Sequence, residues 1–287
     1  GASYGTKLGA TYADLFPERV GRMVLDGAVD LSISSRQLSL QQAAGFETAL
    51  RAYVADCVAQ GDCVLGDSVE EGLATIKGLL DQVDQDPMPT SGSRDLEVGN
   101  AFYGIVLPLY NRDYWPYLTQ GLEAALDGDG TLLLRFSDIY NSRSARGGYT
   151  DNSTEANYAI NCLDNPWSIP ADEVPAQLPA FEKASPTFGT VFAWGLTGCG
   201  GIEVEATEHD RHIDAVGAAP IVVVGTTRDP ATPYQWAQHL ADQLDSGVLV
   251  SRDGDGHTGY NSGNECVDTA IEDYLVDGTV PEDGLSC

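Results

Sequence analysis

The chain begins with a Gly-x-Ser-x-Gly pattern, Gly1 to Gly5, which constrains the fold more than any other stretch. The pattern predicts a nucleophile elbow, a tight turn between a strand and a helix that holds a serine hydroxyl above a sheet. We expect glycine on both sides of Ser3 because a side chain there would collide with neighbouring backbone. Since Gly and Ser are common residues, the prediction also depends on the sequence that follows.

That following sequence supplies the helix and the strand that an elbow requires. Leu8, Tyr12 and Leu15 fall at helical spacing, and Pro17 closes the segment. Residues 22–27 then read as a short buried strand with a turn after it. We therefore predict an α/β protein, the C-terminal part of an α/β-hydrolase sheet with a large helical cap inserted.

Only two residues precede Ser3, although an elbow serine lies at the end of a strand. We therefore expect this chain to be the C-terminal portion of a longer protein. The missing N-terminal part of the same hydrolase fold would be its partner and would supply one of the two oxyanion donors. Within the chain, residues 1–31 and 206–287 read as the α/β core. Residues 32–205 read as a helical cap over the active site.

Helical periodicity in the cap is clearest after Ser68, which with Glu71 predicts a capping box. Further cap helices are predicted over residues 36–60, 99–110, 113–127, 130–141, 151–162 and 186–195. Beyond the cap, the apolar run 220–225 predicts a parallel strand covered on both faces. A helix that carries Trp236, a short strand over 248–250 and a last helix over 267–275 are expected to follow.

The composition is that of a strongly acidic globular protein. Its 43 acidic and 15 basic residues give a formal net charge of −28, which repels nucleic acid and anionic membranes. Such a surface could favour cationic substrates, although a solvated acidic surface is the simpler interpretation. The sequence has no apolar run long enough for a membrane-spanning helix.

The cysteine count is even, and spacing suggests three disulfides among several possible connectivities. The predicted pairs are Cys57–Cys63, Cys162–Cys199 and Cys266–Cys287. Disulfides form in oxidising compartments, so we expect a secreted or cell-envelope associated, extracellular protein. Buried free thiols are the alternative. We predict neither a metal nor a cofactor, because the cysteines and histidines lack zinc spacing and two Asp-Gly-Asp-Gly runs do not match a calcium loop.

A serine nucleophile needs a histidine base, and the base needs an acid to orient it. Asp229 follows the strand at 221–224, and His257 follows the strand at 248–250, in the order expected for this fold. We therefore predict the triad Ser3, Asp229 and His257. The backbone N–H of Tyr4 would be one oxyanion donor.

The chain offers alternatives to Asp229 as the acid and to His257 as the base. Asp26 and Asp30 follow the strand after the elbow helix and are rival acids. Arg228 would lower the pKa of Asp229 if the two side chains met. The other histidines are His209, His212 and His239. None of them follows a predicted strand, so we do not expect any of them to be the catalytic base.

Taken together, these motifs resemble the secreted bacterial tripeptidyl aminopeptidases, close relatives of the proline iminopeptidases among α/β-hydrolases. The similar stretches are Gly1–Thr6, Tyr12–Val20, Val24–Gly27, Ala159–Asp164, Gly225–Pro233 and Asp255–Thr258. The resemblance implies a serine exopeptidase that releases short peptides (tripeptides) from free N-termini through an acyl-enzyme. Its substrate would be a peptide whose terminal ammonium meets a carboxylate of the cap, with Asp164 as the first candidate and Glu155 as the second. The alternatives are an esterase or amidase using the same triad, and an inert fragment that lacks the N-terminal half.

Overall fold

A computed structural model describes residues 1–202 and 213–287 of the chain. The chain divides into two compact units, one of Gly1–Gly45 with His209–Cys287 and the other of Phe46–Glu208. The sequence analysis divides it instead after residues 31 and 205. The first boundary is later because it falls within one long helix, α2 (Ser35–Gln60). His209 and His212 lie outside the described residues.

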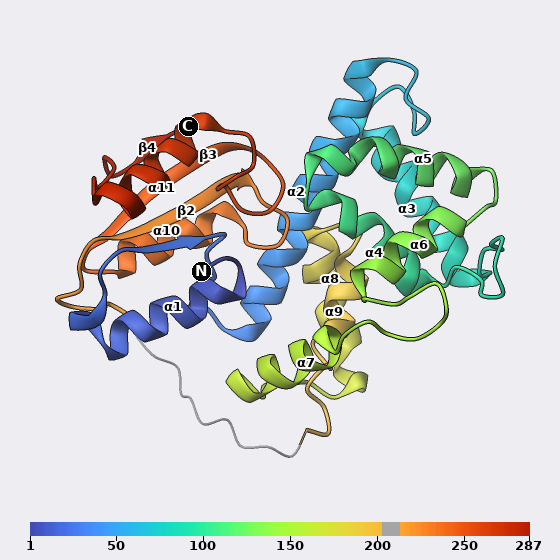
Figure 1. The fold of residues 1–287 in the computed structure, drawn as a ribbon. Coiled ribbons are helices and arrows are strands. Elements are labelled where there is room, and N and C mark those ends of the chain that lie inside the picture. Colours follow the sequence, from blue (N-terminus) through green and yellow to red (C-terminus); the bar gives the residue numbers. More distant parts are fainter. Residues whose placement is uncertain (203–212) are drawn as a thin grey trace. The chain divides into compact units, whose positions relative to one another are not determined.

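The first unit is built on a parallel sheet (Figure 1). Within the described residues its strands are β1 (Met23–Asp26), β2 (Ile221–Arg228), β3 (Gly247–Asp255) and β4 (Leu285–Ser286), in that order across the sheet. Leu25 pairs with Val223, and Val223 pairs with Leu249. On the other edge of β1, Ala2 forms an isolated parallel bridge to Asp26. The residue before the serine therefore lies alongside the sheet.

Helices cover both faces of this sheet, as Figure 1 shows. One face packs against α1 (Tyr4–Leu15) and α10 (Tyr234–Gln243), and the other against α11 (Glu265–Asp277). Four consecutive residues of β2, from Ile221 to Val224, are fully buried and alternate between the two cores. Burying each such side chain stabilises the fold by roughly 1.5–3 kcal/mol. The prediction of a parallel strand covered on both faces is confirmed.

The elbow helix forms as predicted, but it turns its large apolar side chains outward. Leu8 is 67% exposed, and Tyr12 and Leu15 are also exposed. The buried positions of α1 are instead Thr6, Ala10 and Ala13. Small residues are needed on that face because the helix lies very close to the sheet, where a Cβ on Gly9 would come within 2.6 Å of the Leu25 side chain.

The second unit is helical. Besides the rest of α2 it contains α3 (Val69–Gln85), α4 (Val98–Leu109), α5 (Trp115–Leu126), α6 (Thr131–Tyr140), α7 (Ser153–Asp164), α8 (Val174–Ala184) and α9 (Gly189–Gly195). The sequence analysis does not predict α8, which has Pro179 inside it. The capping box at α3 is only half formed. The Ser68 hydroxyl accepts from the Glu71 N–H, but the Glu71 carboxylate accepts from Asp67 rather than from Ser68.

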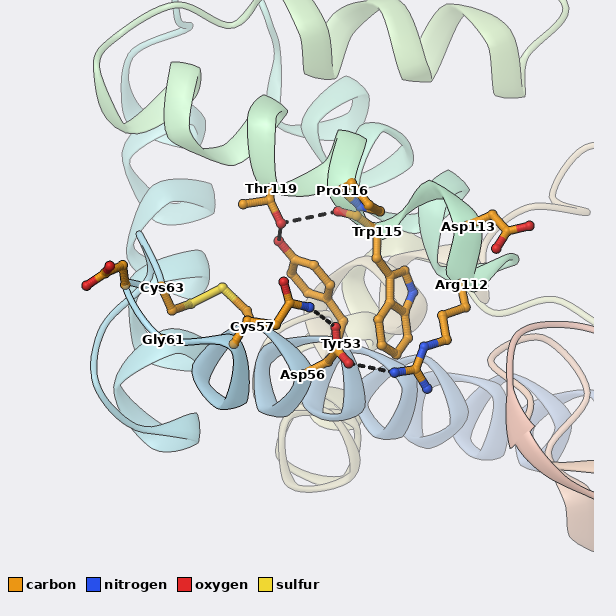
Figure 2. Close-up of a pocket in the computed structure, with 12 residues that line it drawn as sticks. Tyr53, Asp56, Cys57, Gly61, Cys63, Arg112, Asp113, Trp115, Pro116 and Thr119 are labelled. Carbon is orange, nitrogen blue, oxygen red and sulfur yellow. Dashed lines mark hydrogen bonds and ion pairs between the residues drawn. A yellow bond between two sulfur atoms is a disulfide. The ribbon is translucent and has the colours of Figure 1, made fainter.

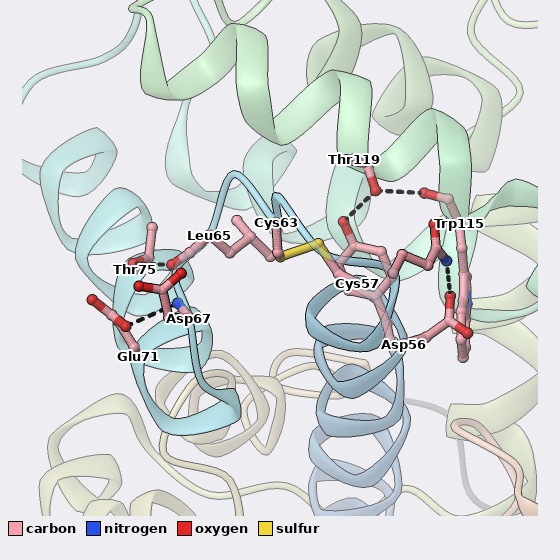
Figure 3. Close-up of a disulfide and its surroundings, with 11 residues drawn as sticks. Asp56, Cys57, Cys63, Leu65, Asp67, Glu71, Thr75, Trp115 and Thr119 are labelled. Carbon is pink, nitrogen blue, oxygen red and sulfur yellow. Dashed lines mark hydrogen bonds between the residues drawn. A yellow bond between two sulfur atoms is a disulfide. The ribbon is translucent and has the colours of Figure 1, made fainter.

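Three disulfides join Cys57 to Cys63, Cys162 to Cys199 and Cys266 to Cys287, the pairs that the sequence analysis proposes. Figure 3 shows the first of them, which ties the last turns of α2 to the loop that leads into α3. The other two each stay within one unit. Among the helices of the described residues, none has the length and apolar character needed to cross a bilayer.

Candidate active site

Ser3 occupies a strained turn between the strand-like pair Gly1–Ala2 and helix α1. Its backbone has φ 54° and ψ −123°, a region that non-glycine residues rarely adopt. The turn is held by the Ser3 N–H, which donates to the Asp26 carbonyl at 2.9 Å, and by the Asp26 N–H, which donates to the Gly1 carbonyl. Strain of this kind is typical of a functional site where the surroundings enforce it.

The steric explanation offered for the two elbow glycines holds at only one of them. A Cβ on Gly1 would lie 2.3 Å from the Gly5 carbonyl oxygen, so only glycine fits there. A Cβ on Gly5 would meet no atom of the described residues within 4 Å. The prediction that any side chain at Gly5 would collide is therefore wrong for the part of the fold that the structure describes.

Asp229 directly follows β2, and its carboxylate is fully buried beside His257. Both carboxylate oxygens lie 2.9 Å from the histidine Nδ1. The same carboxylate accepts from the N–H groups of Ala231, Thr232 and Thr258, and from the Thr232 hydroxyl. Because a carboxylate only accepts, Nδ1 carries a proton and Nε2 is left with its lone pair, which is the tautomer a general base needs.

The imidazole of His257 is well buried, with 12% of its side chain exposed. Burial by itself would lower the pKa of His257 by disfavouring the charged ring. The hydrogen bond that His257 donates to Asp229 and the negative charges of Asp229 and Asp26 outweigh that effect, and the pKa of His257 is raised above its ordinary value. The site is thus built to stabilise a protonated imidazole, which forms when a histidine takes the proton of a nucleophile.

The elbow and the histidine meet at the carboxyl end of β1. The Cε1 atom of His257 lies against Gly27, where an added Cβ would be 3.1 Å away. Gly27 is the next residue after Asp26, whose carbonyl receives the Ser3 N–H. Gly27 also has φ 65°, so glycine is required for its backbone as well as for the space. These contacts bring Ser3, Asp229 and His257 to the same end of the sheet.

Each rival acid has hydrogen-bond partners of its own. Asp30 pairs with His239 at 2.7 Å on helix α10. Asp26 instead accepts from backbone N–H groups just beyond His257. The Arg228 guanidinium forms ion pairs with Asp253 and Asp255.

Tyr4 is the first residue of α1, so its backbone N–H lies at the helix N-terminus. The N–H groups of the first turn point along the helix axis, and the helix dipole favours negative charge there. The next two N–H groups are already engaged, since Gly5 donates to Ala2 and Thr6 donates to Ser3. Tyr4 is thus placed where an oxyanion donor would be needed, directly after the serine.

The two proposed ammonium ligands both lie on α7 in the helical unit. Asp164 is the last residue of the helix and is partly buried, whereas Glu155 is exposed in its first turn. At 3.6 residues per turn, positions nine apart point in roughly opposite directions. The two carboxylates therefore cannot face the same ligand, and a role for Asp164 excludes one for Glu155.

The helical unit also has a pocket of about 620 Å³ that the sequence analysis does not predict (Figure 2). Tyr53 and Trp115 meet edge to face in its wall, and the Arg112 guanidinium lies 5.0 Å from the Trp115 ring. Arg112 also pairs with Asp56 at 2.6 Å. Burial raises the pKa of Tyr53 to about 12, so this phenol stays protonated at physiological pH. The pocket lies apart in sequence from the residues around Ser3.

Comparison with known proteins finds a family match for the part of the chain that carries Asp229 and His257. Residues 185–287, which include both side chains, match the family model described as TAP-like protein. This match shows the TAP-like α/β-hydrolase family for the C-terminal part of the chain. This family and the fold class are those predicted from the sequence.

Among the relatives, "Serine protease Hip1" of Mycobacterium tuberculosis is 37% identical over 100% of this chain and 57% of its own length. "Carboxylesterase B" of the same species is 39% identical over 95% of this chain and 53% of its own length. "Tripeptidyl aminopeptidase" of Streptomyces lividans is 26% identical over 100% of this chain and 53% of its own length. The chain thus spans about half the length of the curated relatives it matches.

The sequence analysis overlooked several residues that build this site. Thr232, Thr226 and Gly27 surround the imidazole and its loop. Asp26 was named only as a rival acid, whereas its carboxylate accepts from the backbone of that loop. Positive φ at Thr258 had no sequence signal, since threonine seldom adopts it. For Gly27, the Asp-Gly dipeptide after a predicted strand was a usable signal, but it reads equally well as an ordinary turn.

Proposed function

We propose that this protein is a serine hydrolase that releases short peptides from free N-termini, with Ser3 as nucleophile, His257 as base and Asp229 as orienting acid. The observation that carries the proposal is the buried Asp229–His257 pair at the end of the sheet where the strained Ser3 turn is tied to β1. The names of the relatives, which include a serine protease and a tripeptidyl aminopeptidase, support it.

In this mechanism the Ser3 hydroxyl attacks the carbonyl carbon of the scissile amide while Nε2 of His257 takes its proton. The carbonyl oxygen becomes negative and is stabilised by the Tyr4 N–H. The C–N bond then breaks, and the imidazolium gives the proton to the leaving amine. Water repeats the sequence on the acyl-enzyme, freeing the peptide acid and restoring Ser3. Asp229 keeps Nδ1 protonated throughout and stabilises the imidazolium.

The second oxyanion donor is proposed to come from another part of the hydrolase fold that is not in this chain. Removing one donor from an oxyanion hole typically costs about 3 kcal/mol of transition-state stabilisation. Full activity is accordingly proposed for this chain together with that partner segment. We also propose an extracellular location, supported by three disulfides, which persist in oxidising surroundings.

An esterase or amidase acting on small substrates is the second candidate, favoured by the relatives named carboxylesterase. Chromogenic tripeptide anilides with free and with acetylated N-termini distinguish the two in the full-length protein. We expect the free-amine substrate to be cleaved roughly 10- to 100-fold more efficiently, because a hydrogen bond between charged groups, lost on acetylation, contributes about 1.5–3 kcal/mol. Equal rates on both anilides, with faster cleavage of short-chain esters, would favour the esterase.

Asp164 is the proposed ligand for the substrate ammonium. Asp164→Asn should raise KM for free-amine peptides far more than for N-blocked esters, because only the former carry the charge that Asp164 would meet. Glu155→Gln is the matched control, since that residue lies on the opposite side of the same helix. Equal changes for both substrate classes in Asp164→Asn would remove Asp164 from the site.

A further inference from the structure

The side chain of Asp26 has no part in the mechanism above, although it is buried next to the site. It belongs to the last residue of β1 and is 6% exposed. Its two carboxylate oxygens accept, at 2.8 Å each, from the N–H groups of Gly259 and Tyr260. Burial raises the pKa of Asp26, and these two backbone hydrogen bonds oppose that shift. Burying a charged carboxylate costs folding free energy unless hydrogen bonds compensate for the lost hydration.

The backbone of the same residue is bonded to the elbow. The Asp26 carbonyl accepts from the Ser3 N–H, and the Asp26 N–H donates to Gly1, both at 2.9 Å. Asp26 is therefore bonded on one side to the turn that holds the nucleophile and on the other to the loop that follows the base. Through one residue, the separation between these two segments is fixed.

The loop that Asp26 holds is strained and needs such a support. Thr258 has φ 72°, a strained backbone conformation for a β-branched residue. Its N–H donates to Asp229, and its carbonyl accepts from the Thr226 hydroxyl. Asp26 takes the next two N–H groups. If these were released, the chain after His257 could relax toward ordinary φ and carry the imidazole with it.

We propose that Asp26 is a positioning residue of the active site, whose carboxylate clamps the loop after His257 onto β1, the strand to which the Ser3 elbow is hydrogen-bonded. This proposal rests on the proposed function, because the distance that it sets is the one between nucleophile and base. Misplacement of a catalytic group by about 1 Å can reduce a rate by roughly 100-fold. The negative charge of the Asp26 carboxylate also helps to raise the pKa of His257.

Asp26→Asn tests the proposal in the full-length protein, because the amide can accept only one of the two hydrogen bonds and has no charge. We expect kcat to fall roughly 10- to 100-fold with little change in KM. The acidic limb of the pH–rate profile should move to lower pH, because one of the negative charges that favour the imidazolium is gone. Asp229 also acts electrostatically on His257 and on Asp26, and Arg252 acts on Asp26; both are unchanged in the variant.

Asp30→Asn is the matched control. Asp30 is equally buried and lies four residues further along, but it is bonded to Ser32 and His239. Its replacement should leave the kcat and the pH profile on the same substrate as they are. A lower thermal midpoint in both variants, with a wild-type kcat and acidic limb in Asp26→Asn, would overturn the proposal and reduce Asp26 to a structural residue.

Two measurements separate this inference from the proposed function. The imidazole titration of His257, followed by NMR, should move to lower pH in Asp26→Asn whether or not the protein cleaves peptides, and an unchanged titration overturns the inference. If the wild type shows no reaction of Ser3 with a fluorophosphonate, the proposed function fails and the titration alone decides.

If Asp26→Asn does not fold, slow hydrogen exchange of the wild-type Gly259 and Tyr260 amides supports the clamp, and exchange as fast as in an exposed loop overturns it.

Discussion

Asp229 is the residue whose replacement should harm the chemistry most while leaving the fold in place. In Asp229→Asn the amide can still accept from the Ala231 and Thr232 N–H groups. Its NH₂ group, however, would donate to Nδ1 of His257 and force the ring proton onto Nε2. Nε2 must be unprotonated to accept the proton of Ser3. We expect kcat to fall by roughly 10³- to 10⁴-fold, with a loss of stability of about 1–3 kcal/mol because the Thr258 N–H loses its acceptor. Activity within about fivefold of the wild type would contradict the assigned role.

Gly27 offers a second residue-scale test. In Gly27→Ala the new Cβ would lie 3.1 Å from both the His257 ring and the Thr232 hydroxyl. It would also sit at φ 65°, where a side chain costs roughly 1–2 kcal/mol. We expect lower stability and a kcat reduced by roughly 10-fold or more, because the imidazole must shift.

Gly128→Ala is the matched control for that variant. Gly128 also has a positive φ, of 90°, but an added Cβ there would meet no described atom within 4 Å. It should therefore show a similar backbone cost in thermal denaturation with an unchanged kcat. If Gly27→Ala also keeps its kcat, the contact between Gly27 and the imidazole has no catalytic role.

At the scale of elements, the crossing of α4 and α6 depends on Gly104. A Cβ at this position would lie 2.4 Å from the Leu133 carbonyl oxygen. Gly104→Ala should therefore destabilise the helical unit by about 1–3 kcal/mol, as overpacking does. Gly99→Ala on the same helix meets nothing described within 4 Å and should be neutral or stabilising by about 0.5–1 kcal/mol. Denaturant midpoints check both, and equal midpoints would contradict the packing account.

The elements that could be predicted from the sequence are those with a strong local pattern. The apolar run that became β2 and the periodic residues of α3 are examples. Helix α8 was missed because prolines interrupt its pattern, and β4 because a strand of two residues, Leu285–Ser286, has no periodicity. In α1 the helical period was right, but the spacing of its large apolar residues did not reveal the buried face, since close packing on β1 selected small residues there.

The candidate site was predictable only as far as residue type and order along the chain determine it. Ser3, Asp229 and His257 could be chosen because each follows a predicted strand or forms the elbow itself. The role of Asp26 could not, because its hydrogen bonds go to the backbone of Gly259 and Tyr260, which lies far along the chain. A hydrogen bond to a backbone N–H cannot be recognised from residue types, because every residue except proline carries that group.

At the scale of the whole molecule, the formal net charge of −28 is the dominant electrostatic feature. Like charges repel one another in the compact state, and salt screens them over a Debye length of about 10 Å at 0.1 M. We expect the thermal midpoint to rise as NaCl is increased from about 0.01 to 0.3 M at neutral pH. A midpoint that falls over this range would mean that favourable ion pairs outweigh the repulsion.

The most direct test of the account is the site of reaction with a fluorophosphonate, mapped by peptide mass spectrometry on the full-length protein. We predict a single adduct on Ser3. It should be absent in Ser3→Ala and should form at least about 100-fold more slowly in His257→Ala, which lacks the general base. An adduct on another residue, or a His257→Ala protein that reacts at the wild-type rate, would contradict the account.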